Sequence, residues 1–148
     1  MTREEAFARL GRSVFRSRFK LTAEDIAYID RVGLETIRRH AADFVRQKLA
    51  PAVPEKDGRQ TPMRGHPVFK AMHGSAMCCR GCMEKWWKVP RGRPLTAEQQ
   101  SKAVGFLMEW IVRRLAPTPD SRVGAPGSVC RLHCRIDGEG IRLVECGT

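Results

Sequence analysis

The chain has 148 residues, of which 42% are apolar and 29% are charged, and its formal net charge is +11. This length allows one domain with a hydrophobic core, and the balance of apolar and charged residues is that of a globular protein, which excludes a disordered chain. No stretch approaches the ~18 apolar residues of a membrane span, and the first residues lack the apolar run of a signal peptide. We therefore expect a cytoplasmic protein without membrane contact, in which cysteines are reduced thiols or metal ligands.

Two regular helices are predicted on either side of a cysteine-rich segment. Thr22 followed by Asp25 is typical of a capped helix start. Apolar residues then recur at helical spacing as far as Pro51: Ile26, Ile29, Ile37, Ala41, Phe44, Val45 and Leu49. The pattern predicts one helix of about 25 residues, which Gly33 could bend or interrupt.

A polar connection rich in proline and glycine, residues 51–65, follows this helix and is typical of a loop. The second long helix is predicted from Thr96, where "TAEQ" forms a capping box, to Leu115, before "APTP" ends it. Sequence therefore predicts a mainly α-helical, small single domain over residues 1–116.

The last 32 residues, 117–148, have a different character. "TPDSRVGAPG" is typical of a linker, and "SVCRLHCRIDGEGIRLVEC" alternates around a "DGEG" turn signal, which favours a C-terminal β-hairpin. Cys130, His133 and Cys134 could form a second metal site, or simply pack as part of the tail together with Cys146. We therefore expect a linker followed by a tail or hairpin.

The segment "HGSAMCCRGC", residues 73–82, holds three of the six cysteines and one of the four histidines. Cys79 and Cys82 form a C-x-x-C pair, a spacing that lets two thiolates turn towards one ion, and His66 and His73 lie upstream. These four residues have the number and types of donor for tetrahedral zinc, and closed coordination of this kind favours a structural ion over a catalytic one. A short helix between the histidines would hold them about 10 Å apart, so Cys78 is an alternative to His66.

Other functions of the same segment remain open. The C-x-x-C pair could be a thioredoxin-like redox pair, and a cysteine with a histidine base could be a nucleophile. A metal-dependent hydrolase or nuclease would need an ion that keeps a water and a base, for which Glu84 is the nearest choice. Trp86 and Trp87 could stack on bases or bind a protein partner, or they could belong to the core. His40 is expected to pack beside its helical neighbours.

Positive charge gathers in two places. Residues 1–20 hold six basic and two acidic residues, and residues 51–95 hold nine basic and three acidic residues. Clustered positive charge favours a polyanionic partner, because neutralised phosphates release counterions; the alternative is a solvated basic surface. The residues expected to contact DNA or RNA are Arg64, Lys70, Arg80, Lys85, Lys88, Arg91 and Arg93.

Motifs along the chain resemble a family catalogued as a domain of unknown function, DUF4186. They are "TAEDIAYID", "GLETIRRHAADF", "TPMRGHPVF", "CCRGC", "EKW" and the later P-x-G-R-x-L-T pattern, and they fall in the family's order over about residues 1–115. The resemblance implies a small bacterial protein and supplies no activity. The family pattern has a further histidine where this chain has Trp87, so this chain has one donor fewer if that histidine is a ligand.

Together these observations predict a small zinc-binding protein in which a zinc-knuckle-like insertion shapes a basic surface that contacts nucleic acid. A metal-dependent hydrolase or nuclease and a protein-protein adaptor are the alternatives.

Overall fold

The computed structural model describes residues 1–115, 135–137 and 140–142. Contacts divide the chain into two compact units, Met1–Thr118 and Pro119–Thr148. Among the described helices, none combines the length and the apolar character that a membrane crossing requires.

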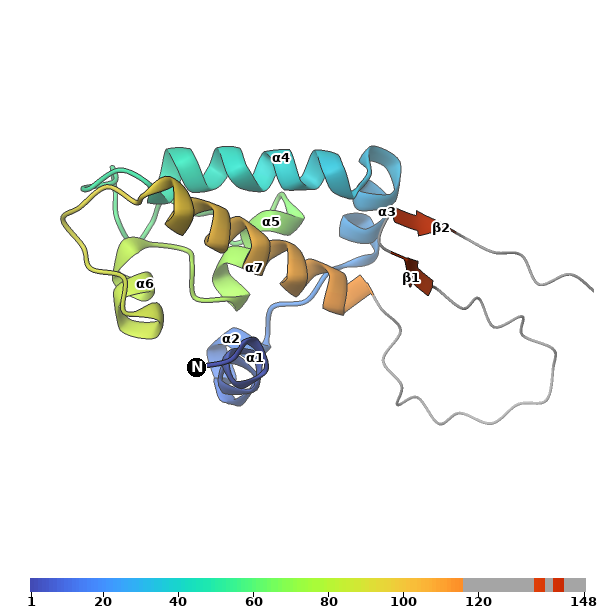
Figure 1. Ribbon diagram of the computed structural model, residues 1–148, viewed down its shortest axis with the longest axis horizontal. Coiled ribbons are helices and arrows are strands. Elements are labelled where there is room, and N and C mark those ends of the chain that lie inside the picture. The colour runs from blue at the N-terminus through green and yellow to red at the C-terminus, as the bar shows by residue number, and fades with distance from the viewer. Residues whose placement is uncertain (116–134, 138–139, 143–148) are drawn as a thin grey trace, which may run out of the picture. The chain divides into compact units, whose positions relative to one another are not determined.

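The first unit is built from helices alone in its described part (Figure 1), which confirms the mainly α-helical fold class. In chain order they are α1 (Arg3–Arg12), α2 (Val14–Ser17), α3 (Ala23–Val32), α4 (Leu34–Phe44), the π-helical turn η1 (Val45–Leu49), α5 (Pro67–Gly74), α6 (Arg80–Trp87) and α7 (Ala97–Leu115).

The first long helix of the prediction is two helices in the structure. Thr22 caps α3 as expected, since its side chain accepts the Asp25 amide hydrogen and the Asp25 side chain bonds back to the Thr22 amide. Gly33 then adopts φ +84°, a left-handed value that favours glycine, and its N–H closes α3 on the carbonyl of Ile29. Gly33 thus interrupts the helix and α4 begins at Leu34.

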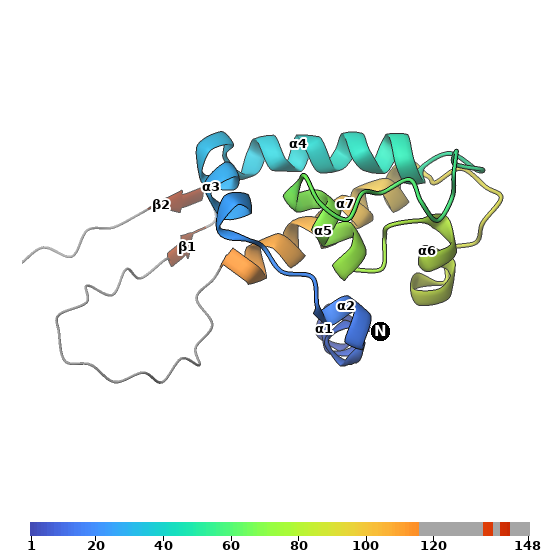
Figure 2. The ribbon, with the colours of Figure 1, turned by 180° about the vertical axis from the view of Figure 1, so that it is seen from behind.

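The core lies where α4, α5 and α7 meet (Figures 1 and 2). Its fully buried members are Ile37, Ala41, Val45, Leu49, Val68, Ala71, Met72, Ala76, Leu107, Trp110 and Ile111. At the contact between α5 and α7 the backbone of Gly74 lies against the indole of Trp110. A Cβ at position 74 would be only 2.6 Å from the ring. This close approach requires glycine.

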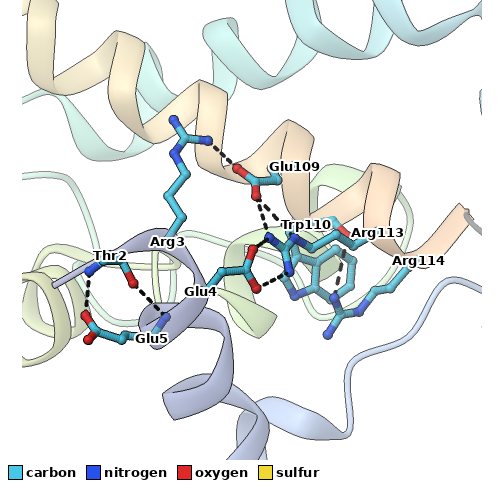
Figure 3. A network of polar contacts seen from close by, with 8 residues as sticks. All are labelled: Thr2, Arg3, Glu4, Glu5, Glu109, Trp110, Arg113 and Arg114. Atoms are coloured by element: carbon cyan, nitrogen blue, oxygen red, sulfur yellow. Dashed lines mark hydrogen bonds and ion pairs between the residues drawn. The ribbon is translucent and has the colours of Figure 1, made fainter. Parts of the chain in front are cut away.

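The N-terminal helix α1 lies against α7 (Figure 3). Arg3 pairs with Glu109, and Arg113 pairs with both Glu4 and Glu109. The guanidinium of Arg113 also lies 4.0 Å above the ring of Phe7. Exposed pairs of this kind add little stability one by one, but the network and the ring contact hold the α1–α2 segment on the domain. Part of the basic charge of residues 1–20 is therefore neutralised within the chain.

Two short strands are described in the second unit. Strand β1 (Arg135–Asp137) pairs antiparallel with β2 (Gly140–Arg142), with Ile136 opposite Ile141. The predicted linker from Pro117, and the tail residues Cys130, His133, Cys134 and Cys146, lie outside the described residues.

Candidate metal centre

Three cysteine sulfurs meet where α5 ends and α6 begins. The Sγ atoms of Cys78, Cys79 and Cys82 all lie within 4.8 Å of one another. Cys78 and Cys79 are buried, and Cys82 is half-buried. Three thiolates on one zinc ion, with bonds of about 2.3 Å, lie roughly 3.8 Å apart, so shifts of about 1 Å would bring these sulfurs to a common ion. The cluster could therefore hold a metal ion.

Local structure explains how Cys79 and Cys82 come together. Cys79 is extended, with φ −159° and ψ 166°, and is the N-cap of α6. Its sulfur accepts the Cys82 amide hydrogen at 3.3 Å. A side chain that caps a helix lies over the first turn, so the residue three positions later is brought beside it. The helix cap thus places the two cysteines of the C-x-x-C pair side by side.

A buried arginine from α2 faces the cluster. Arg16 is 8% exposed. Its guanidinium donates to the sulfur of Cys82 at 3.2 Å, to the sulfur of Cys78 at 3.5 Å and to the carbonyl of His73 at 2.7 Å. Within residues 1–115 no carboxylate pairs with it. Burial lowers the pKa of Arg16, but hydrogen bonds and Coulomb attraction from the two sulfurs raise that pKa overall, so the group stays charged.

The three thiols differ in acidity. A hydrogen bond from Cys82 lowers the pKa of Cys78 despite burial, and Arg16 lowers that pKa further. Burial raises the pKa of Cys79. The hydrogen bond to Cys78, with burial, raises the pKa of the Cys82 thiol strongly. A single negative charge is thus favoured at Cys78, and a bound cation would be needed to remove the other protons.

The loop before α5 holds the cluster from the other side. The hydroxyl of Thr61 donates to the carbonyl of Cys78 at 2.7 Å, and Asp57 accepts the Arg80 amide hydrogen at 2.9 Å. Both contacts fix the backbone on either side of Cys79. The cysteines therefore stand on a backbone that is anchored by a distant segment of the chain.

The Arg80 side chain lies inside the domain. It is 1% exposed, and its guanidinium donates to the carbonyls of Leu49, Pro51, Pro90 and Arg93 at 2.7 to 3.1 Å. The Leu49 carbonyl lies at the end of η1, the Pro51 carbonyl lies in the loop that follows, and the other two lie in the loop after α6. Arg80, which the sequence places in a nucleic-acid surface, thus ties together two loops and α6, and its charged group does not face solvent.

The structure does not bring His66 to the cysteines. Its Nδ1 accepts the Val68 amide hydrogen at 3.0 Å, so His66 is the N-cap of α5, and its Nε2 lies 3.0 Å from Nδ1 of His40. The ring packs edge-on against Tyr28 and Phe44. Burial and His40 lower the pKa of His66 to about 4. Both ring nitrogens are occupied, which explains why this imidazole is not a donor to the cluster.

His73 lies closer to the cysteines but is also outside the group of converging donors. Its Nε2 is 3.0 Å from the carbonyl of Thr61, and the ring stacks on Phe19. Because a carbonyl only accepts, Nε2 carries the hydrogen. Only Nδ1 of His73 could then bind an ion. Of the predicted ligands, the structure brings together Cys79 and Cys82, and it adds Cys78, the alternative ligand.

The predicted nucleic-acid residues fall into three groups. Arg64, Lys85, Lys88, Arg91 and Arg93 are exposed. Lys70 is largely buried and paired with Asp25. Arg80 is buried, as described above.

Sequence reasoning missed Arg16, Thr61 and Asp57 as neighbours of the cluster. Arg16 lies among five other basic residues in residues 1–20 and carries no local pattern that separates it from them. The contacts of Thr61 and Asp57 with residues 78–80 span 17 and 23 positions. No periodicity or spacing within one element could reveal these contacts.

Fold and site together define a small helical domain whose three clustered thiols could hold a metal ion. The chain belongs to the family described as Domain of unknown function (DUF4186), whose model matches residues 4–112. This match confirms the resemblance carried by the motifs, and it includes all three cysteines of the cluster. No solved structure matches the chain.

Proposed function

We propose that Cys78, Cys79 and Cys82 bind one zinc ion that stabilises this helical domain. The observation that carries the proposal is Arg16, a buried cation whose side chain meets two cysteine sulfurs and, in the described part of the chain, no carboxylate. A buried charge is costly unless an opposite charge lies beside it. The sulfurs are the groups in contact with Arg16 that can carry this negative charge.

A divalent ion bound by three thiolates also satisfies the charge of Arg16. Three thiolates and one Zn²⁺ carry a net charge of −1, which the guanidinium of Arg16 neutralises. Hydrogen bonds to ligand atoms from such neighbouring groups orient the ligands and tune the metal site. Sulfur donors favour zinc over hard cations such as magnesium or calcium.

A structural role fits the surroundings of the site better than hydrolysis. Three sulfurs leave one position of a tetrahedral ion open, which a hydrolase would also need. However, the two carboxylate oxygens of Glu84, the expected base, both accept hydrogen bonds from Arg91. In contrast, an ion at the cysteines would join α2, the loop before α5 and the first turn of α6 through contacts that already exist.

Elemental analysis of the purified full chain, with thiol titration before and after chelation, tests this function. We expect a zinc equivalent that Cys82→Ser abolishes and Cys146→Ser retains, and three thiols that become reactive only after chelation. Arg16→Met is expected to weaken zinc binding about 10-fold or more, whereas Arg12→Met, which changes the charge of an exposed position, leaves it unchanged. Reactive thiols without zinc in the untreated protein would refute the proposal and favour the redox pair.

Nucleic-acid contact is a second candidate function, and the observation in its favour is local. Lys85, Lys88, Arg91 and Arg93 are all exposed along the end of α6 and the following loop. Glu84 is the only acidic residue among residues 80–95, and Arg91 pairs with it. This segment therefore has a net positive surface that could contact phosphates.

Binding of DNA and RNA oligonucleotides over a range of salt concentrations tests the second candidate. Arg91→Ala with Arg93→Ala removes two charges while leaving the Arg93 carbonyl that Arg80 needs. We expect weaker binding and a salt slope reduced by about 2, compared with the control Arg38→Ala with Arg39→Ala on α4. Equal losses in the two double variants would show that only the total charge matters.

A further inference from the structure

A pocket of about 730 Å³ lies away from the cysteine cluster, between the segment that joins α2 to α3, the first turns of α3 and the start of α5. This volume is within the range of small-molecule sites. Its charged lining residues are Arg18, Lys20, Glu24, Asp25, Arg64 and Lys70. Neither the metal centre nor the exposed end of α6 contributes a residue to it.

The floor of the pocket is a largely buried ion pair. Lys70 donates to Asp25, and the side chains of the two residues are 13% and 10% exposed. Asp25 also accepts from the amide and hydroxyl of Thr22, at 2.8 and 3.0 Å. Burial raises the pKa of Asp25, but these hydrogen bonds lower it overall, so the carboxylate stays charged and occupied. An ammonium has three N–H donors, and Lys70 uses one of them within residues 1–115.

Once this pair is set aside, the remaining charge of the pocket is positive. Three basic residues remain, Arg18, Lys20 and Arg64, and one acidic residue, Glu24. All four side chains are exposed. A phosphate monoester carries a charge of about −1.5 to −2 at pH 7, which matches this excess, whereas a single carboxylate carries only −1. Arginine suits such a group further, because its guanidinium can hold phosphate oxygens through two parallel hydrogen bonds.

Backbone and apolar groups complete the pocket. The first turn of α3 leaves the amide hydrogen of Glu24, which lines the pocket, without a partner in the described part of the chain, and free amides at a helix start favour anions. The walls include Phe19, Tyr28 and Met63, and Met63 is 47% exposed. The site therefore offers donors for an anion beside an apolar surface for the body of a ligand.

We propose that this pocket binds a small organic phosphate, with the phosphate at Lys20, Arg64 and Lys70 and the organic part against Phe19, Tyr28 and Met63. The ligand would enter independently of any metal ion, since no cysteine lines the pocket. Failure of the zinc proposal would therefore leave this one standing, and the reverse also holds.

Titration of the full chain with phenyl phosphate at 150 mM salt tests the inference. Calorimetry measures the affinity, and amide chemical shifts locate the binding site. We expect saturable binding with shifts at residues 18–28 and 63–70, weaker binding of inorganic phosphate and none of phenol. Arg64→Ala and Lys20→Ala should each weaken phenyl phosphate binding at least fivefold. Arg38→Ala, which removes one exposed charge from α4, should leave it unchanged.

Three results would overturn the proposal. Equal weakening by Arg64→Ala and Arg38→Ala would show non-specific attraction to a basic protein. Phenylacetate binding as tightly as phenyl phosphate would reject the phosphate class. Binding of oligonucleotides that depends on Arg64, with no binding of phenyl phosphate, would assign the pocket to a macromolecule instead.

Discussion

Replacement of Arg80 by methionine tests the claim that this arginine is an internal tie. The substitution keeps most of the aliphatic length and removes the guanidinium. It leaves four backbone carbonyls, those of Leu49, Pro51, Pro90 and Arg93, without their charged donor. Leu49 is fully buried, so water cannot easily replace the hydrogen bond that its carbonyl accepts from Arg80. In the variant, the loop after η1 and the loop after α6 therefore lose the hydrogen bonds that join them to α6.

The expected cost follows from the number and kind of these bonds. A hydrogen bond to a charged group contributes about 1.5–3 kcal/mol, but bonds from one side chain do not add fully. A buried acceptor that is left without a partner costs about 1–3 kcal/mol, so the loss of several at once amounts to about 3–5 kcal/mol. We expect Arg80→Met to lower the free energy of unfolding by about this amount, which is a large part of the roughly 5–15 kcal/mol of an ordinary domain.

Urea denaturation of the full chain, followed by far-ultraviolet circular dichroism, measures this cost. Arg38→Met is the matched control, because Arg38 is exposed on α4, and its free energy of unfolding should stay within about 0.5 kcal/mol of the parent. A loss of less than about 1 kcal/mol in Arg80→Met would contradict the reasoning, because it would mean that the four carbonyls do not depend on the guanidinium.

Two other substitutions test the packing and the histidine cap. In Gly74→Ala the new methyl group would lie 2.6 Å from the Trp110 ring, so thermal denaturation should show a loss of about 1–3 kcal/mol. Gly11→Ala, where nothing lies within 4 Å, should be neutral or slightly stabilising, and equal effects of the two would contradict the clash. Because burial and His40 lower the pKa of His66 from 6.5 to about 4, the unfolded chain binds more protons between these values, and stability should fall as pH falls from about 6.5 to 4. His66→Asn, which keeps a capping oxygen, should flatten that decline in denaturation at several pH values; an unchanged slope would assign it to other groups.

Helix boundaries could be predicted from sequence because their determinants are local. Thr96 accepts the Gln99 amide hydrogen and Gln99 bonds back to the Thr96 amide, which confirms the predicted capping box of α7. The short helix expected between the two histidines is α5, in which Pro67 takes the first position and His66 is the cap. In both cases the partners are at most three residues apart, so the pattern of residue types suffices.

The ligand environment could be predicted only in part, because its determinants are distant in sequence. The C-x-x-C pair identifies the place of the cluster correctly, but the guanidinium of Arg16 reaches Cys78 across 62 positions. His66 had the right residue type and an acceptable spacing. Its contact with His40, 26 positions away, and its cap on α5 occupy both nitrogens, and only the fold could decide this competition.

The interior position of Arg80 illustrates the same limit for charge patterns. Arginine next to cysteine in a basic segment is typical of a surface, yet the four carbonyls that accept from Arg80 lie 10 to 31 positions away and hold its side chain inside the domain. The sum of charges along a segment is visible in the sequence. The fold decides which of these charges face solvent, because it decides which backbone carbonyls lie close enough to accept from a buried side chain.

X-ray absorption at the zinc edge tests the central claim most directly. The sample is the full chain with Cys130→Ser, Cys134→Ser and Cys146→Ser, so that all remaining sulfur ligands come from Cys78, Cys79 and Cys82 together. Our account predicts three sulfur atoms at about 2.3 Å from each zinc and one lighter donor. Two sulfur atoms with two imidazole nitrogens, or no bound zinc, would contradict it.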